Sequence, residues 1–321
     1  MVNSSSLRRL GKTDLMVSPI GLGVMELAGG GKLLGRAFPV IPQEDKNAII
    51  KAAVDGGINF FDTAEIYGAG VSEQSLAAGL KAAGVSDQDV VIETKWQPLL
   101  RSARNIDRTI GDRLHYLEGY TISNYMIHMP VSFSSTESEM NAMADLVEEG
   151  KIRSVGVSNF GPARMRRAHA ALAKRGLPLA LNQVHYSLLH RKIERNGVLE
   201  TAKELDVTIV AYTPLEKGVL SGKYHKNPDM LAKCSGMRRR MLKRDVERAR
   251  PLMAVMDEIA ARHNATPAQV ALNWLIHFNG EIVVAIPGAT RAHQAQESAG
   301  AMNFVLSVDE MKRLDEASRG V

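Results

Sequence analysis

Four side chains that can exchange protons follow three neighbouring apolar runs of the sequence. The run INFF is followed by Asp62 and, five residues later, by Tyr67. The runs VVIET and NYMI lead in the same way to Lys95 and His128. A lone lysine or histidine in such a place is usually solvated or satisfied by its neighbours, and a surface turn is the plainer interpretation of each site alone. Four proton-active groups at successive run ends instead predict one proton-transfer site.

These four residue types together favour the protonation of an oxyanion. A tyrosine titrates at about pH 10, so it needs help to act as a proton donor at neutral pH. A neighbouring ammonium lowers the pKa of a phenol, and a carboxylate beside that ammonium keeps it charged. We therefore expect Tyr67 to be the general acid, Lys95 its activator and Asp62 the partner of Lys95. His128 then orients or polarises a carbonyl oxygen. Such a set contains no reductant, so hydride has to come from a cofactor.

The spacing of these groups predicts the elements that hold them. Asp62 and Lys95 are 33 residues apart, as are Lys95 and His128, and each step has the length of one strand and one helix. Amphipathic patterns predict helices over 44–57, 72–84, 136–150 and 162–176, with glycines where the helices should end. The runs predicted to be strands are 19–24, 58–63, 90–95, 121–128, 152–158, 179–185, 207–212 and 281–287.

Eight strands joined by crossover helices must run parallel, and right-handed crossovers can close them into a (β/α)8 barrel. An open, doubly wound sheet is the alternative. The N-terminal LRRLGKTDLMVSPI predicts a β-hairpin with its turn at Gly11-Lys12, capping the bottom of the barrel. A longer insertion over 213–265 and a final helix near 307–318 exceed the plain repeat. We expect one barrel domain over residues 1–321, with extra C-terminal helices.

Composition narrows the class of protein. The 321 residues are 45% hydrophobic, enough for one large core, and contain a single cysteine, which excludes an intrachain disulfide. The N-terminus lacks the apolar segment of a signal peptide, and no run approaches the roughly 18 apolar residues of a membrane helix. These features predict a soluble, cytoplasmic protein without a membrane partner. The oligomeric state is not predicted.

Basic residues are concentrated in one segment of a chain whose net charge is +5. KCSGMRRRMLKRDVERAR (233–250) holds eight Lys or Arg residues against two acids. The segment lacks the interleaved aromatics of a nucleic-acid site, so no nucleic-acid partner is expected. We interpret it as a solvated helix face or a mobile loop, and more weakly as a lid over an anionic ligand.

The usual nucleotide-binding motifs are incomplete. GLGVME (21–26) has Glu26 where GxGxxG needs its third glycine, and GGGKLL (29–34) lacks the Ser or Thr of a P-loop. Barrels of this kind bind phosphate at the loops after strands seven and eight, through backbone N–H groups and helix N-termini. TPLEKGVLSGK (213–223) and IPGATRAHQAQES (286–298) occupy those two places.

The chain resembles the aldo-keto reductase superfamily over nearly its whole length. INFFDTAEIYGAGVSE, the strand end at Lys95, IHMP, KIRSVGVSNF, LNQVHYSLLHR, AYTPLEKGVLSGK and IPGATRAHQAQES occur in the order of that family. The resemblance implies an NADPH-dependent carbonyl reductase of small-molecule aldehydes or ketones. Its Tyr–Lys–Asp–His tetrad corresponds to Tyr67, Lys95, Asp62 and His128, and no metal is implied.

The resemblance also implies roles for other residues. Ser158, Asn159 and Gln183 should hydrogen-bond the nicotinamide carboxamide, and Tyr212 should stack on the nicotinamide ring. The further cofactor-binding positions are Gly23, Val24 and Met25 beneath the nicotinamide; Asp62; Leu215, Gly218, Leu220 and Lys223 around the pyrophosphate; and Ile286, Gly288, Thr290, Gln294, Glu297 and Ser298 around the adenosine and its 2′-phosphate. The substrate pocket should involve Trp96, Met129 and loops at 28–42 and 215–245, although Trp96 and Met129 are equally compatible with packing at the barrel rim.

Several departures from the family pattern bear on the cofactor. Glu216 stands where a small residue is usual, and an acid beside a pyrophosphate is unfavourable unless a neighbouring lysine offsets it. His185 stands where Glu is frequent, and the sequence gives no reason for it. Gly288 and Gln294 stand where some members have cations, so Arg291 or the basic segment would have to bind a 2′-phosphate. NADP(H) is favoured, and NAD(H) stays open.

Two other functions remain open from the sequence. Channel β-subunits resemble the same family and act as cofactor-binding redox sensors with little turnover. Lys95 could alternatively form a Schiff base, as in an aldolase barrel, but a neighbouring Asp62 would keep the amine protonated and so argues against it.

Overall fold

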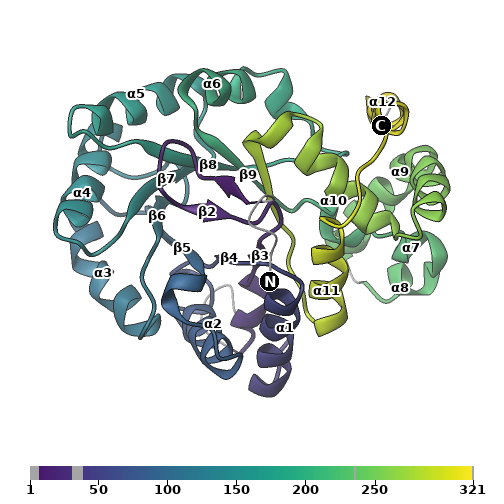
Figure 1. Cartoon of the computed structure of the whole chain (residues 1–321), viewed down its shortest axis with the longest axis horizontal. Helices are drawn as coiled ribbons and strands as arrows, with labels where there is room; N and C mark the ends of the chain where they lie inside the picture. Colours follow the sequence, from purple (N-terminus) through teal and green to yellow (C-terminus); the bar gives the residue numbers. More distant parts are fainter. Residues whose placement is uncertain (1–6, 31–38, 235, 320–321) are drawn as a thin grey trace.

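The computed structural model describes residues 7–30, 39–234 and 236–319, and its eight parallel strands form a closed barrel (Figure 1). The strands follow one another in chain order around the sheet, from β3 to β10. The bridges Ile20–Ala285 and Gly23–Gly288 join the first strand region to the last. The predicted barrel is therefore confirmed, and the open sheet is wrong.

Each of the eight predicted runs overlaps one strand. Six strands are shorter than their runs, because the pairing ends where the chain turns into the loops of the two barrel faces, and the strands over 91–96 and 179–185 have the same length as theirs. The strands are β3 (Leu22–Gly23), β4 (Phe60–Asp62), β5 (Val91–Trp96), β6 (Asn124–Ile127), β7 (Ser154–Ser158), β8 (Leu179–His185), β9 (Thr208–Tyr212) and β10 (Val283–Ile286).

Helices surround the barrel and pack against its outer face (Figure 1). The α-helices are α1 (Gln43–Asp55), α2 (Val71–Ala82), α3 (Arg104–Tyr116), α4 (Thr136–Glu148), α5 (Pro162–Ala173), α6 (Val198–Leu205), α7 (Lys223–Lys226), α8 (Pro228–Ala232), α9 (Gly236–Arg262), α10 (Pro267–His277), α11 (Ala292–Gly300) and α12 (Val308–Arg319). Short 3-10 turns are η2 (Met25–Ala28), η4 (Asp87–Asp89), η5 (Lys192–Glu194), η6 (Glu216–Gly218) and η7 (Gly280–Ile282). After α1 and α2 the chain turns at Gly57 (φ 89°) and Gly84 (φ 70°), left-handed conformations that favour glycine.

Two cores lie on either side of the strands, because successive side chains point to opposite faces. The outer core fills the space between strands and helices. The inner core includes Phe60, Val91 and Met126 from the strands, with Leu10 and Leu15 inserted from the hairpin. The hairpin, β1 (Arg8–Arg9) and β2 (Met16–Val17), lies across one end of the barrel, as predicted (Figure 1).

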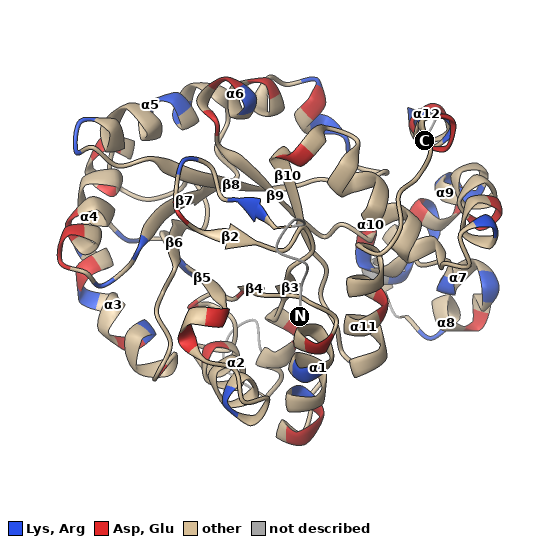
Figure 2. Ribbon diagram, in the orientation of Figure 1, with Lys and Arg blue, Asp and Glu red and all other residues tan. Residues whose placement is uncertain are grey.

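The basic segment is helical over most of its length. It forms the first half of α9, which packs against α10 and α12 beside the barrel (Figure 1). Both basic and acidic residues lie along this helix (Figure 2), most of the charged residues described over 236–250 are exposed, and Lys243 lies 3.9 Å from Glu247. The interpretation as a solvated helix face is confirmed. No helix in the described parts of the chain is long and apolar enough to cross a membrane.

Candidate active site

The four predicted proton-active residues meet at the carboxyl ends of β4, β5 and β6. The Lys95 ammonium donates hydrogen bonds to Asp62 Oδ1 and, over 2.7 Å, to the carbonyl of Thr63. Lys95 Nζ lies 5.0 Å from the centre of the Tyr67 ring. The rings of Tyr67 and His128 are 5.8 Å apart and nearly perpendicular. The constellation expected from the strand-end pattern is therefore assembled in space.

The charges of this cluster are buried. Lys95 is fully inaccessible, and Asp62 and Tyr67 are 4% and 8% exposed. Burial alone would lower the pKa of Lys95, but Asp62, Tyr67 and Glu93 together raise it above its ordinary value. Lys95 is therefore a permanent ammonium at neutral pH, and its positive charge acts on any group that binds next to the Tyr67 hydroxyl.

Lys95 lowers the pKa of Tyr67 as expected, but burial raises this pKa by more. Burial raises the pKa of Tyr67 to about 12, and Asp62 and Glu26 add to the rise. Lys95 opposes it through its charge and a hydrogen bond, but does not outweigh burial. Tyr67 is consequently a fully protonated phenol, and Lys95 makes its proton easier to release than burial alone would allow.

His128 is held as a neutral imidazole. Burial, reinforced by the charge of Lys95, lowers its pKa to about 3. Its Nδ1 is buried and has no hydrogen-bond partner in the described residues. A neutral imidazole carries one N–H, which can polarise a carbonyl oxygen without competing with Tyr67 as the acid.

The residues expected to bind a carboxamide form a connected group at the ends of β7, β8 and β9. Asn159 donates to Ser158 Oγ (3.0 Å) and accepts from the Tyr212 hydroxyl (3.1 Å). Ser158 donates to the Gln183 carbonyl over 2.9 Å. Asn159 has a φ of 61°, the left-handed conformation that asparagine tolerates better than most residues.

Gln183 connects this group to the tetrad through Asp62, and it also contacts Glu93, a residue that sequence reasoning missed. Its amide nitrogen donates to Asp62 Oδ1 (2.8 Å) and to Glu93 Oε1 (2.6 Å). Glu93 lies two residues before Lys95 on the same strand and is fully buried. The signal was present in the sequence, since an acid inside the apolar run VVIETK shares the inward face with Lys95.

The first and last loops approach each other closely. Gly23 N donates to the Pro287 carbonyl over 3.1 Å, and a Cβ on Gly23 would lie 3.2 Å from the Ile286 carbonyl. A Cβ on Gly288 would lie 2.5 Å from the carboxyl group of Glu26. Glu26 is a second residue missed as a site candidate, and burial raises its pKa to about 7. Val24 and Met25 lie between these contacts, with Val24 N donating to the Asp62 carbonyl.

Glu216 and His185, which both depart from the family pattern, contact each other. Glu216 accepts hydrogen bonds from His185 Nε2 (2.7 Å) and Ser187 Oγ (2.6 Å). Burial raises the pKa of Glu216, but these two bonds outweigh it and leave the pKa below its ordinary value. The ring of His185 stacks between those of His190 (3.8 Å) and Tyr212 (5.3 Å). The partners of the Glu216 carboxylate are thus on and after β8.

The remaining predicted cofactor residues lie on the same face of the barrel. Thr290 donates through its N–H and hydroxyl to Gln294 Oε1, which ties the loop after β10 to α11. Arg291 immediately precedes α11. The other members are Leu215, Gly218 and Leu220 in the loop after β9, Lys223 at the start of α7, Ile286 and Gly288 at the end of β10, and Glu297 and Ser298 on α11.

The predicted substrate residues differ in their surroundings. Trp96 is fully buried in the outer core, and its indole N–H donates to Asn105 of α3, which favours the rim-packing interpretation. Met129 is half-buried beside His128. Part of the expected loop, residues 31–38, lies outside the described residues.

The residues present fit a nicotinamide dinucleotide. Among the described residues, no donor contacts Gln183 Oε1, which leaves this atom at the carboxyl end of β8 for the carboxamide of a cofactor. The N-terminus of α11 provides backbone N–H groups near Arg291. In the described parts of the chain, no three His, Cys, Asp or Glu side chains form a group that could hold a metal.

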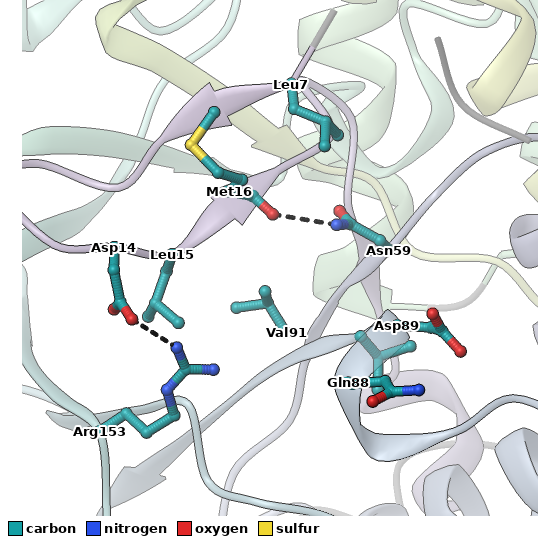
Figure 3. Close-up of a pocket in the computed structure, with 10 residues that line it drawn as sticks. Leu7, Asp14, Leu15, Met16, Asn59, Gln88, Asp89, Val91 and Arg153 are labelled. Atoms are coloured by element: carbon teal, nitrogen blue, oxygen red, sulfur yellow. Dashed lines mark hydrogen bonds and ion pairs between the residues drawn. The ribbon is translucent and has the colours of Figure 1, made fainter. Parts of the chain in front are cut away.

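A separate cavity lies at the opposite end of the barrel. Its volume is about 410 Å³, and Figure 3 shows it between the hairpin and the amino ends of the strands. Asp14 pairs with Arg153 over 2.8 Å at its edge, and Asn59 donates to the Met16 carbonyl. None of the proton-active residues lines it.

A closed barrel with a buried Asp–Lys–Tyr–His cluster at the carboxyl ends of its strands defines a class of proton-transferring barrel enzymes. The model of the aldo/keto reductase family matches residues 19–319, and the chain belongs to this family. It is an oxidoreductase of the aldo-keto reductase type.

Similar proteins span nearly the whole chain. An uncharacterized oxidoreductase of Mycobacterium tuberculosis is 35% identical over 308 residues, covering 94% of this chain and 90% of the relative. The aldo-keto reductase yakc of Schizosaccharomyces pombe, whose name specifies NADP(+), is 30% identical, covering 86% and 83%. The crystal structure of the thermostable aldo-keto reductase Tm1743 with the inhibitor epalrestat has a TM-score of 0.76 at 30% identity, covering 97% and 99%.

Proposed function

We propose that this protein reduces aldehydes or ketones to alcohols with NADPH, and that Tyr67 donates the proton. The observation that carries the proposal is the fully buried Lys95 ammonium, paired with Asp62 and lying 5.0 Å from the centre of the Tyr67 ring. A buried ammonium in this place stabilises negative charge on an adjacent oxygen, which is the charge that develops during carbonyl reduction.

Each residue of the tetrad has a distinct task in this mechanism. Bound NADPH supplies the hydride. His128, a neutral imidazole, donates a hydrogen bond that orients the substrate oxygen. Tyr67 gives its proton to that oxygen, and Lys95 stabilises the phenolate left behind. Asp62 keeps Lys95 charged, which also makes Lys95 a poor nucleophile and argues against a Schiff-base mechanism.

The residues around the tetrad are proposed to hold the cofactor. Ser158, Asn159 and Gln183 bind the carboxamide, while Tyr212 supports one face of the nicotinamide ring. The loops after β9 and β10 bind the phosphates. The preference for NADPH over NADH is supported by Arg291 at the start of α11 and by the NADP(+) named for the yeast relative.

The proposal is tested by a screen of carbonyl substrates, beginning with 4-nitrobenzaldehyde, with NADPH and NADH side by side. We expect turnover that is faster with NADPH at equal concentration. The matched variant Tyr67→Phe removes only the hydroxyl, and it should lose about 10²- to 10⁴-fold in rate while its NADPH affinity stays within about threefold. Tight NADPH binding without turnover across the panel would favour a cofactor-binding sensor instead, and equal rates in Tyr67→Phe would refute the role of the phenol.

A further inference from the structure

Glu93 is a buried carboxyl group without a counter-ion inside the barrel. It lies between Val91 and Lys95 on the inward face of β5 and is fully inaccessible. In the described parts of the chain, its Oε1 accepts one hydrogen bond, from Gln183, and its Oε2 has no hydrogen-bond partner. Among the described residues, no Lys or Arg nitrogen lies within 4.0 Å of it. The ammonium nearby, Lys95, is directed to Asp62.

Burial without a counter-ion favours the protonated, uncharged form of such a group. An isolated carboxylate in a dry interior costs several kcal/mol, and it takes up a proton instead. Burial and the neighbouring Asp62 carboxylate raise the pKa of Glu93 well above its ordinary value. Asn124, the register neighbour of Glu93 on β6, also leaves its Oδ1 without a donor. Two buried oxygen atoms at this level of the barrel, Glu93 Oε2 and Asn124 Oδ1, therefore lack a donor among the described residues.

Glu93 restricts the orientation of the Gln183 amide. Both N–H groups of that amide are used, one by Asp62 and one by Glu93. Turning the amide over would place its oxygen against the Asp62 carboxylate, which is repulsive. The amide oxygen accepts no hydrogen bond from the described residues, so it is the atom left for a ligand.

We propose that Glu93 is a positioning residue for the nicotinamide, acting through Gln183. By holding the amide nitrogen inward, it makes Gln183 a pure acceptor toward the bound cofactor. A carboxamide can satisfy that acceptor only with its NH₂ group, so its oxygen must face Ser158 and Asn159. This fixes the rotation of the carboxamide and with it the ring face turned to the substrate. The inference rests on the proposed function, in which Gln183 binds the carboxamide.

The test measures binding rather than turnover. Dissociation constants are determined by fluorescence for NADPH and for 2′-phospho-ADP-ribose, which lacks the nicotinamide. Glu93→Leu removes the acceptor and should weaken NADPH about tenfold while leaving 2′-phospho-ADP-ribose within about twofold, the size expected for one buried hydrogen bond. Glu93→Gln keeps an acceptor for the Gln183 amide, so it should bind NADPH within about threefold of the wild type.

Two further variants separate positioning from a general disturbance. Glu93→Asn is polar but too short to reach Gln183, so it should behave as Glu93→Leu does, even if the leucine variant fails to fold. In a Gln183→Leu background, Glu93→Leu should have no additional effect on NADPH, because the two residues act as one unit.

The inference is overturned if Glu93→Leu and Glu93→Asn bind NADPH as tightly as the wild type, or if they lose affinity for both ligands alike. It is also overturned if Glu93→Gln is as weak as Glu93→Leu, since an anionic role would then be required. A wild-type protein that binds 2′-phospho-ADP-ribose but gains nothing from the nicotinamide would refute the proposed function itself.

Discussion

Lys95 contributes to both activity and stability, so a single substitution of Lys95 would change both together. It is the only cation paired with the buried Asp62 among the described residues, and its nitrogen lies 5.0 Å from the centre of the Tyr67 ring. Removing it abolishes the stabilisation of a phenolate, and it also leaves a carboxylate buried without a counter-ion. The first effect lowers activity, and the second lowers stability.

A pair of variants separates these effects. Lys95→Met should lose at least about 10²-fold in the rate of aldehyde reduction. Its free energy of unfolding should fall by about 3–5 kcal/mol, because Asp62 is left unpaired. The double variant Asp62→Asn/Lys95→Met removes both charges, so it should regain most of the stability and none of the activity. Denaturant titration and initial rates measure the two quantities. A Lys95→Met protein with the wild-type rate would refute the activating role.

At the scale of elements, the loop after β9 is fixed by contacts to the end of β8. Thr213, Glu216 and Lys217 have φ values of 53°, 48° and 56°, so three non-glycine residues adopt the left-handed conformation within five positions. Such backbone persists only where other contacts determine it. The hydrogen bonds of Glu216 to His185 and Ser187 are those contacts. His185 and Glu216, which both depart from the family pattern, therefore form one structural unit.

The contact between His185 and Glu216 predicts that substitutions at these two positions have non-additive effects on stability. His185→Glu alone places a second carboxylate against Glu216 and should lower the melting temperature. Glu216→Ala alone removes the contacts that hold the loop and should lower it less. The double variant His185→Glu/Glu216→Ala removes the repulsion, so its loss should be smaller than the sum of the single losses by about 1–3 kcal/mol. Thermal unfolding measures this coupling, and the exposed His115→Glu is the control. Additive losses would show that the pair is not coupled.

The sequence predicted the elements well and the contacts between loops poorly. All eight strands and the hairpin follow from apolar runs and turn residues, which are local signals. Asp62, Lys95 and His128 could be placed together because parallel strands end at one face of a barrel. The contact between His185 and Glu216 depends on how two adjacent loops fold, and no local pattern encodes it. The outward position of Trp96 follows from its alternation with the inward Lys95 on the same strand.

For the whole molecule, burial of ionisable groups at the carboxyl end of the barrel makes stability depend on pH. Glu26, beside Gly288, has a pKa raised from 4.5 to about 7 by burial, with Asp62 adding to the rise. The folded state therefore holds a proton that the unfolded state releases at lower pH. The stability is fully present below about pH 4.5, and it is lost progressively as the pH rises to about 7.

The variant Glu26→Gln removes this dependence and serves as its test. The difference in unfolding free energy between the variant and the wild type should grow in favour of the variant from pH 4.5 to pH 7, then stay constant. Its total change is on the order of 2–3 kcal/mol, since each pH unit contributes at most about 1.4 kcal/mol. Denaturant titrations at half-unit pH steps measure it, with Glu44→Gln, at an exposed carboxyl on α1, as the matched control. A difference that does not change between pH 5 and pH 7 would mean that Glu26 is ionised in the folded protein, and the loop around Gly288 would then carry a negative charge where the cofactor phosphates are proposed to bind.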